Sequence, residues 1–298
     1  MLLPKFEFHE PETLKEAAAI LSGIGEPTSI LAGGTDLLVN MKKGKASPRH
    51  LVSLGRVREL KKTARDGESL RIGACVTVAE LREEREIKDD FDGLFRGAGL
   101  LGSPLIRNLA TVGGNIVTAR PAADLPPPLI AYGATIELVK DNGERILSLE
   151  DFIKGPGETS IEPGEILSGI ILREPPLYSG GGYVKLGMRK ALEISLVNVA
   201  TFFALDGPSG PIQKARVVLG SVGPTPIRSL RAEEILTGER PDEALFEKAG
   251  EAAANDAKPI DDFRASAEYR SEMVKLLTRK ALKQAYEEAK LREWRRWK

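Results

Sequence analysis

The sequence is poor in the side chains that most often hold metal ions. Its 298 residues include one cysteine, Cys75, and two histidines, His9 and His50. A single thiol excludes an internal disulfide and any iron–sulfur cluster held by this chain alone, because such clusters need about four thiolates. The histidines lie far apart in the sequence, without the spacing of a zinc or di-iron site, so we expect no metal site. Low cysteine content suits a reducing compartment, and we expect a cytoplasmic protein.

Long apolar runs and an excess of charge are also absent. No window approaches the roughly 20 apolar residues that span a bilayer, so we expect no membrane span. The 43 Lys and Arg residues balance the 43 Asp and Glu residues, which argues against a nucleic-acid partner. There is no Gly-Lys-Ser or Gly-Lys-Thr triplet and no G-x-S-x-G elbow, which argues against a nucleotide triphosphatase and a serine hydrolase.

Glycine is abundant, and two glycine pairs are the most informative feature of the chain. Gly33 and Gly34 lie in the stretch LAGGTDLL, and Gly113 and Gly114 lie in TVGGNI. Residues without Cβ let backbone N–H groups approach an anion closely, so each pair is a possible phosphate cradle as well as a possible plain turn. Thr35, Thr111 and Asn115 could add side-chain donors. Two such cradles would hold one diphosphate between them, and Asp36 would cap the helix that begins at Leu37.

The first half of the chain alternates expected strands and helices. A helix is predicted over residues 11–21, and a capping box at Thr77 and Glu80 starts another. Strand 28–31 leads directly into the first glycine pair. Further strands are expected at 50–54 and 69–74.

The second half predicts antiparallel structure and then a separate small domain. Asn142-Gly143 between two apolar runs indicates a hairpin, and a strand at 165–172 completes this region. Two prolines and a glycine triplet within 174–182 are typical of a linker, where we place the domain boundary. Beyond it we expect strands at 183–186, 196–205 and 215–222, followed by helices from Arg228, Pro241 and Ala267, which together form an α+β domain.

Three further candidates have a structural and a functional interpretation. Residues 97–102 (GAGLLG) match the dinucleotide fingerprint, but they follow no strand, so packing of small residues on a helix is favoured. Asp124 could cap a turn. Lys185, in an apolar run, could point outward, or inward to bring positive charge to a site.

The motifs AGGTDLL at 32–38 and TVGGNI at 111–116, with Asp124, the strand EIL at 165–167 and YVK at 183–185 in this order, resemble the FAD-binding medium subunit of molybdenum hydroxylases. That family includes the flavoprotein subunit of aerobic carbon monoxide dehydrogenase and the FAD domain of xanthine dehydrogenase. The likeness extends from Phe6 to about Glu287.

The resemblance implies a mixed α/β and α+β fold in two parts. Residues 1–176 would form an FAD-binding PCMH-type domain like that of vanillyl-alcohol oxidase, with subdomains at about 1–55 and 56–176. Residues 177–298 would form a small C-terminal α+β domain with a three-stranded antiparallel sheet and helices, like that of carbon monoxide dehydrogenase flavoproteins.

The resemblance also implies which residues contact FAD. Asp124 would bond near the adenosine or ribityl part, Lys185 and Ile194 would lie by the isoalloxazine, and Leu101 and Leu167 would pack on the cofactor. The diphosphate would be lined by the two motifs: Leu31, Ala32, Gly33, Gly34, Thr35, Asp36, Thr111, Val112, Gly113, Gly114 and Asn115. No residue of this chain is expected to be catalytic toward substrate.

The implied function is electron transfer inside a hetero-oligomeric oxidoreductase. A molybdopterin large subunit would oxidise the substrate, and an iron–sulfur small subunit with [2Fe–2S] clusters would pass electrons to FAD on this chain. FAD would deliver them to an external acceptor, with Lys185 stabilising the reduced flavin. An assembly subunit with a vestigial flavin site and a self-contained flavin oxidase are the alternatives.

Overall fold

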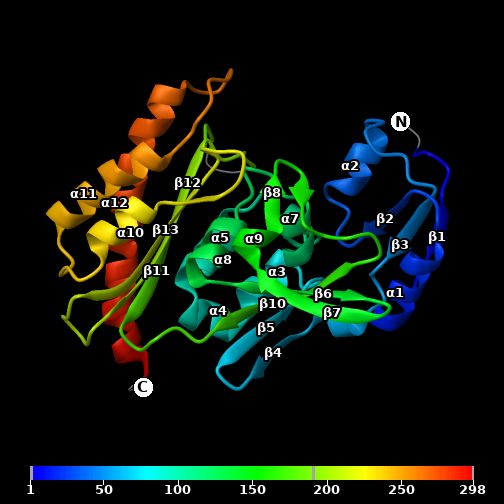
Figure 1. Cartoon of the computed structure of the whole chain (residues 1–298), viewed down its shortest axis with the longest axis horizontal. Coiled ribbons are helices and arrows are strands. Elements are labelled where there is room, and N and C mark those ends of the chain that lie inside the picture. Colours follow the sequence, from blue (N-terminus) through cyan, green and yellow to red (C-terminus); the bar gives the residue numbers. More distant parts are fainter. Residues whose placement is uncertain (1–2, 190–191, 297–298) are drawn as a thin grey trace.

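The protein is arranged as three successive lobes along its long axis, each built around a β-sheet (Figure 1). The computed structural model describes residues 3–189 and 192–296. No helix in these ranges has the length and apolar character that crossing a bilayer requires.

The N-terminal lobe contains a three-stranded parallel sheet in the order β1-β3-β2. Parallel strands need crossover connections, and two helices supply them. Thr13 caps the first helix by accepting the N–H of Glu16. The elements are β1 (Glu7–His9), α1 (Leu14–Gly23), β2 (Thr28–Leu31), α2 (Leu37–Lys42) and β3 (His50–Ser53).

The middle lobe has an antiparallel five-stranded sheet in the order β4-β5-β10-β6-β7. The predicted hairpin is present, with Lys140 paired to Gly143 around a two-residue turn. The sheet consists of β4 (Thr63–Asp66), β5 (Ser69–Gly73), β6 (Thr135–Lys140), β7 (Gly143–Ser148) and β10 (Ile166–Arg173). β8 (Ile153–Gly155) and β9 (Glu158–Thr159) form a separate two-stranded ladder.

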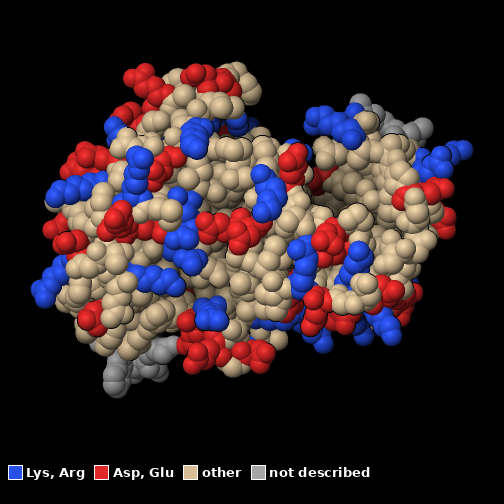
Figure 2. Space-filling model, in the orientation of Figure 1, with Lys and Arg blue, Asp and Glu red and all other residues tan. Residues whose placement is uncertain are grey.

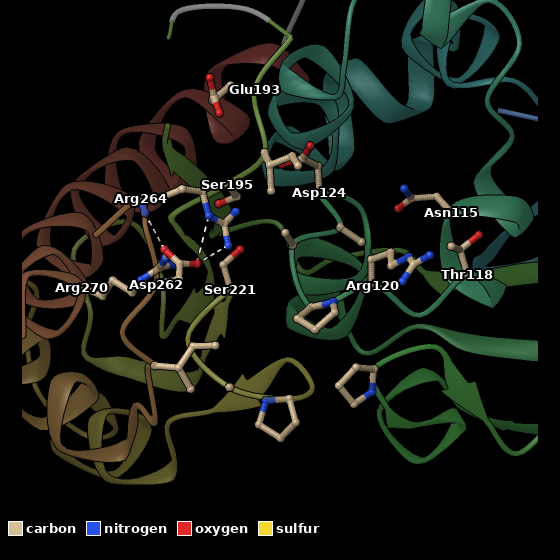
Figure 3. A pocket seen from close by; sticks show the side chains of 18 of the residues that line it. Asn115, Thr118, Arg120, Asp124, Glu193, Ser195, Ser221, Asp262, Arg264 and Arg270 are labelled. Carbon is tan, nitrogen blue, oxygen red and sulfur yellow. Dashed lines mark hydrogen bonds and ion pairs between the residues drawn. The ribbon is translucent and has the colours of Figure 1, made fainter. Parts of the chain in front are cut away.

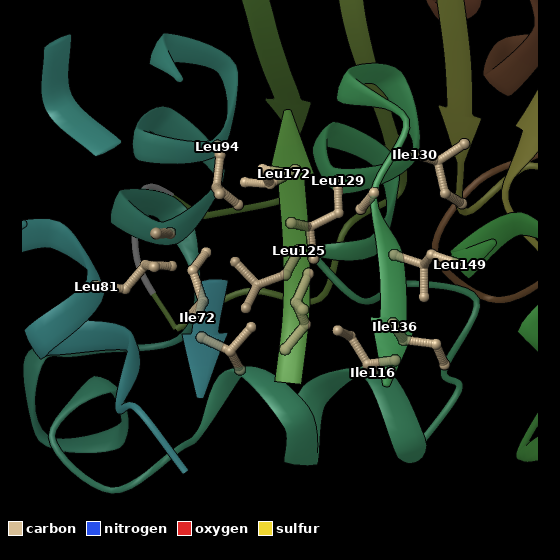
Figure 4. Packing of buried hydrophobic residues seen from close by; sticks show 14 of the residues in the cluster. Ile72, Leu81, Leu94, Ile116, Leu125, Leu129, Ile130, Ile136, Leu149 and Leu172 are labelled. Atoms are coloured by element: carbon tan, nitrogen blue, oxygen red, sulfur yellow. The ribbon is translucent and has the colours of Figure 1, made fainter. Parts of the chain in front are cut away.

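Short helices cover one face of this sheet, and side chains of the helices and of the sheet together form the largest core (Figure 4). Thr77 and Glu80 form the expected capping box at the start of α3. The fingerprint-like residues 97–102 lie on and just after α5 rather than in a phosphate loop. The helices are the 3-10 turn Arg58–Lys61, α3 (Val78–Glu83), α4 (Arg85–Asp90), α5 (Asp92–Leu100), α6 (Pro104–Arg107), α7 (Val112–Val117), α8 (Pro126–Tyr132) and α9 (Leu149–Phe152).

The C-terminal lobe is a four-stranded antiparallel sheet, one strand more than expected, because the two-residue β14 pairs with β13. Helices α10 to α12 cover one face, and α5 and α8 of the middle lobe contact the strands of the sheet as well (Figure 1). The elements are β11 (Ser179–Leu186), β12 (Val197–Leu205), β13 (Ile212–Gly220), β14 (Ile227–Arg228), α10 (Leu230–Leu236), α11 (Glu243–Asp256) and α12 (Ala267–Arg296).

The glycine triplet 180–182 is not part of a linker, contrary to expectation, but lies in β11. A Cβ at Gly180 or Gly182 would lie 2.1 Å from a backbone carbonyl oxygen of α12, and one at Gly181 would lie 2.1 Å from the Tyr132 hydroxyl. The triplet therefore allows α12 and Tyr132 to pack directly against the strand.

Candidate functional site

The two glycine motifs, distant in sequence, line one cavity of about 330 Å³ between the N-terminal and middle lobes. Figure 2 shows the surface hollowed between these lobes, with charges of both signs around it. The expected residues in its wall are Ala32, Gly33, Gly34, Thr35, Asp36, Leu101, Thr111, Gly113, Gly114, Asn115 and Leu167. Leu31 and Val112 are not in the wall, and Val112 is fully buried.

Two of the glycines are required by close packing beside this cavity. A Cβ on Gly33 would lie 1.9 Å from the carbonyl oxygen of Leu109, just before the second motif. A Cβ on Gly113 would lie 2.7 Å from the Cβ of Ala74. The first motif can therefore approach the segment leading to the second only because Gly33 has no side chain.

The first motif presents free backbone donors. Within the described part of the chain, the N–H groups of Gly33, Gly34, Thr35 and Asp36 make no hydrogen bond. Gly34 has φ +71°, a left-handed conformation that glycine adopts without strain. Consecutive unbonded N–H groups in such a turn can bind an oxyanion, as expected for this motif.

The second motif differs from the expectation of a second amide cradle. The N–H groups of Val112 and Gly113 donate to the carbonyls of Val76 and Ala74, at 2.9 and 2.8 Å. Those of Gly114 and Asn115 donate to Oγ1 and the carbonyl of Thr111. The prediction was wrong because these four amides are already bonded: Thr111 caps α7, and the carbonyls of Ala74 and Val76, in the loop after β5, accept the first two N–H groups of the helix. The N–H groups of Val112 to Asn115 are therefore not available to a ligand, and Thr111 and Asn115 can contribute side-chain donors.

Asp36 also differs from its predicted role. It precedes α2, but its side chain makes no capping hydrogen bond, and its φ and ψ of −102° and −49° are already helical. An N-cap residue normally has extended geometry, which brings its oxygen to the free N–H groups of the helix. The Asp36 side chain is exposed at the rim between two cavities instead.

The second cavity, of about 870 Å³, lies between the middle and C-terminal lobes and shares Asp36, Asn115 and Thr118 with the first. The two cavities therefore adjoin at these three residues, and volumes of this order are typical of small-molecule sites. Figure 3 shows Asn115, Thr118 and Arg120 on one side and Ser195, Ser221 and the Asp262 group on the other. The expected residues Asp124 and Ile194 also line this cavity, and Ile194 is 60% exposed.

Asp124 and Lys185 form a buried ion pair, so Lys185 points inward and Asp124 is not a turn cap. Lys185 Nζ lies 2.7 Å from Asp124 Oδ2, and each side chain is 7% exposed. The ammonium also donates to the carbonyl of Leu100, and the Tyr183 hydroxyl donates to Asp124 Oδ1 at 2.7 Å. Burial raises the pKa of Asp124, although Lys185 and Tyr183 act to lower it. Lys185 itself is not among the residues lining either cavity.

The arginines on the two walls of the larger cavity were not predicted from the sequence: Arg120 lies on one wall, and Arg264 and Arg270 lie on the other. Arg120 is exposed and forms no ion pair with any described residue. Opposite it, Asp262 binds Arg264 and Arg270, at 3.0 Å to Arg264 Nε and 2.8 Å to Arg270, and these bonds lower the pKa of the carboxyl. The available signal was the position of Arg120 four residues after the end of the second motif.

Family models match both parts of the chain. Residues 4–175 match the FAD binding domain in molybdopterin dehydrogenase, and residues 182–285 match the CO dehydrogenase flavoprotein C-terminal domain. The carbon monoxide dehydrogenase medium chain of Afipia carboxidovorans is 32% identical, over 97% of this chain and all of the relative. A putative xanthine dehydrogenase FAD-binding subunit of Escherichia coli is 32% identical, over 93% of this chain and 95% of the relative.

Solved structures support the same family assignment. The match to carbon monoxide dehydrogenase from Hydrogenophaga pseudoflava has a TM-score of 0.91 and 30% identity, and covers 97% of this chain and 99% of the other. A chain of quinoline 2-oxidoreductase from Pseudomonas putida matches with a TM-score of 0.90, at 27% identity over 97% of this chain and all of the other. The predicted fold class is thereby confirmed. The chain belongs to the FAD-binding medium subunits of molybdenum hydroxylase-type oxidoreductases.

Proposed function

We propose that this chain holds FAD along the two joined cavities and is the electron-output subunit of a molybdenum-dependent dehydrogenase complex. The observation that carries the proposal is that the two glycine motifs line one cavity, which continues through Asp36, Asn115 and Thr118 into a larger one. An elongated site with a donor-rich turn that reaches the junction of its two parts fits a dinucleotide, whose diphosphate lies between its two nucleoside parts.

The residues present fit a diphosphate at the first glycine motif. Four consecutive N–H groups, from Gly33 to Asp36, have no partner among the described residues and are available to its oxygens. Asn115 accepts the N–H of Leu125 with Oδ1, which leaves its amide donors for the ligand. Arg120 adds a positive charge nearby, and Leu101 and Leu167 provide apolar contact.

The larger cavity would accept the flavin ring between the middle and C-terminal lobes. Ile194 offers an apolar surface there, and Asp124 holds Lys185 in place behind the wall. The charge of Lys185 is paired with that of Asp124, and Lys185 does not line the cavity. Its expected role beside the flavin ring therefore stays a prediction. In this arrangement residues 1–176 and 177–298 are the two domains, and each contributes one wall.

Bound flavin supplies the capacity to take electrons singly and release them singly or in pairs. This chain would receive them from an iron–sulfur small subunit, itself reduced by a molybdopterin large subunit, and an external acceptor would remove them. The relatives described as medium chains of carbon monoxide dehydrogenase support a hetero-oligomer of this kind. This chain would orient the cofactor and exclude water around it.

Arg120→Gln tests the proposal without disturbing the core, since the side chain is exposed and unpaired among the described residues. Loss of one charge-assisted contact predicts about 10–100-fold weaker FAD binding, measured by titrating apoprotein and following flavin fluorescence. Arg58→Gln, another exposed arginine without an ion pair to a described residue, is the control and should bind FAD like the unaltered chain.

Equal affinity in all three proteins would remove Arg120 from the site. A chain that stays colourless after incubation with FAD would favour the assembly role. Turnover of a substrate by the isolated chain would favour the self-contained oxidase. Reduction of the bound flavin by the partner subunits and their substrate, with none by this chain alone, supports the electron-output role.

A further inference from the structure

The only two histidines of the sequence meet on the N-terminal lobe, away from the proposed flavin site. His9 Nε2 lies 3.1 Å from His50 Nδ1, and the ring centroids are 5.3 Å apart. The carboxylate of Glu7 joins them, at 3.9 Å from His9 Nε2 and 3.6 Å from His50 Nδ1. One ligand atom from each residue lies within 4.8 Å of the others.

Strand geometry explains this cluster. β1 and β3 are parallel neighbours, and their register pairs Glu7 with His50. His9 is two residues beyond Glu7, and side chains two apart on a strand share a face. The three side chains therefore converge on one face at an edge of the sheet, a relation that the sequence does not reveal.

The spacing of the three ligand atoms fits a metal ion. Two nitrogens bound to zinc at 2.0–2.1 Å in tetrahedral geometry lie about 3.3 Å apart. The two nitrogens are 3.1 Å apart, His9 Nε2 lies 3.9 Å from Glu7 Oε1, and His50 Nδ1 lies 3.6 Å from the other carboxylate oxygen, Oε2. A small movement of Glu7, whose side chain is 68% exposed, would bring one of its carboxylate oxygens and the two nitrogens to a common ion.

A second carboxylate, that of Glu26, faces the other ring nitrogen of His50. Glu26 Oε2 lies 3.6 Å from His50 Nε2, and Arg49 holds the same oxygen at 3.1 Å. With its proton on Nε2, the nitrogen that faces this carboxylate, His50 would direct the Nδ1 lone pair toward His9 and Glu7. Metal-binding histidines usually donate the N–H of the other ring nitrogen to a carboxylate, a backbone carbonyl or a water, and Glu26 is the carboxylate placed for this role.

We propose that Glu7, His9 and His50 form a site for a divalent transition-metal ion of the zinc type. Two imidazoles and one carboxylate are donors that such ions prefer. The imidazoles are 20% and 15% exposed, so their orientations are largely fixed, and the exposed Glu7 leaves the ion a path and a coordination position for water. The bound ion ties the short edge strand β1 to β3.

The test uses untagged full-length protein, so that no histidines are added to the two in the sequence. We expect one equivalent of Zn²⁺ to bind saturably by calorimetry and to shift the imidazole nitrogen signals of both histidines in NMR spectra. Cys75 will not compete, because it is buried and burial raises the pKa of its thiol to about 11.

Variants separate ligation from nonspecific binding. His9→Gln and His50→Gln should each abolish saturable binding, Glu26→Gln should weaken it about 10–100-fold, and the exposed Glu247→Gln should leave it unchanged. FAD affinity should stay the same in all of them, so this result is independent of the proposed function.

Absence of saturable Zn²⁺ binding to the unaltered chain, or equal binding after His50→Gln, would overturn the proposal. The NMR titration keeps it testable if a variant fails to fold. Unchanged signals from both histidines at saturating Zn²⁺ would show that the two rings form only a hydrogen bond.

Discussion

Lys185 and Asp124 show how one residue pair can matter to both stability and site geometry. Both side chains are almost fully buried, and the carboxylate has two hydrogen-bond partners, Lys185 and Tyr183. Removing one member of a buried pair leaves the other charge without compensation, which costs more than the pair itself contributes. The pair is therefore a sensitive point of the wall between the middle and C-terminal lobes.

Lys185→Met should lower the free energy of unfolding by about 3–5 kcal/mol at pH 8. Burial already raises the pKa of Asp124, and loss of Lys185 raises it further, so the folded state holds the proton more tightly than the unfolded state. Stability then falls as pH rises through the interval between the unfolded-state and folded-state pKa values. The loss should consequently be larger at pH 8 than at pH 5 in urea titrations.

Two variants check this explanation. Lys185→Met with Asp124→Asn should recover part of the loss and remove its pH dependence. Lys275→Met, which breaks an exposed pair with Glu272, should cost about 1 kcal/mol or less at either pH. A loss after Lys185→Met that is the same at both pH values would contradict the role assigned to Asp124.

Single residues were predictable from the sequence when their partners are close along the chain. Thr77 and Glu80 form the expected capping box three residues apart. The meeting of His9 with His50 and the packing of Gly33 on Leu109 depend on how distant segments fold together. Asp36 was mispredicted because its capping role depends on backbone angles that its residue type does not determine.

Among the elements, β11 depends most directly on the absence of side chains. Its glycines let α12 approach until the carbonyls of Ala281 and Ala285 would lie 2.1 Å from a Cβ on Gly182 and Gly180. These contacts are with backbone atoms, which cannot move aside by rotating a side chain. The packing of the whole helix on the sheet is therefore sensitive to a single methyl group.

Gly182→Ala should lower the free energy of unfolding by at least about 1–3 kcal/mol, the usual cost of overpacking. Gly25→Ala is the control, because a Cβ there meets nothing within 4 Å. Urea unfolding followed by circular dichroism measures both, and hydrogen exchange should become faster along α12 only in Gly182→Ala. Equal stability of the two variants would show that α12 does not need the glycine.

At this scale, the elements with local signals were predicted well. The hairpin around Asn142-Gly143, strand β2 and the helix from Leu37 are where the sequence placed them. The glycine triplet was assigned to a linker because glycines needed for a turn and glycines needed for close packing look alike in sequence. Which of the two applies depends on α12, about a hundred residues further along the chain.

Across the whole molecule, the candidate site takes walls from all three lobes. The smaller cavity lies between the N-terminal and middle lobes, and the larger one lies between the middle and C-terminal lobes. A ligand that spans both cavities should therefore stabilise the contacts at both junctions between lobes. A ligand that fills only one cavity should stabilise only the junction at that cavity.

FAD should slow hydrogen exchange in residues 33–36 and in residues 221–224, on opposite sides of the joined cavities. ADP, which lacks the flavin, should protect residues 33–36 and leave 221–224 unchanged. The outer face of α11 serves as an internal control, with no change in either case. Protection of only one region by FAD would argue against a ligand that extends through both cavities.

Strand β12 takes part in two cores at once. Ala200, Phe202 and Ala204 pack with the middle lobe, whereas Val197, Val199 and Phe203 pack with α11 and α12. A chain cut between residues 176 and 177 would expose the contact between the middle lobe and the face of β12 that carries Ala200, Phe202 and Ala204, on both fragments. Separately expressed halves should therefore aggregate or reassociate, and heating the intact chain should melt the middle and C-terminal lobes in a single cooperative transition.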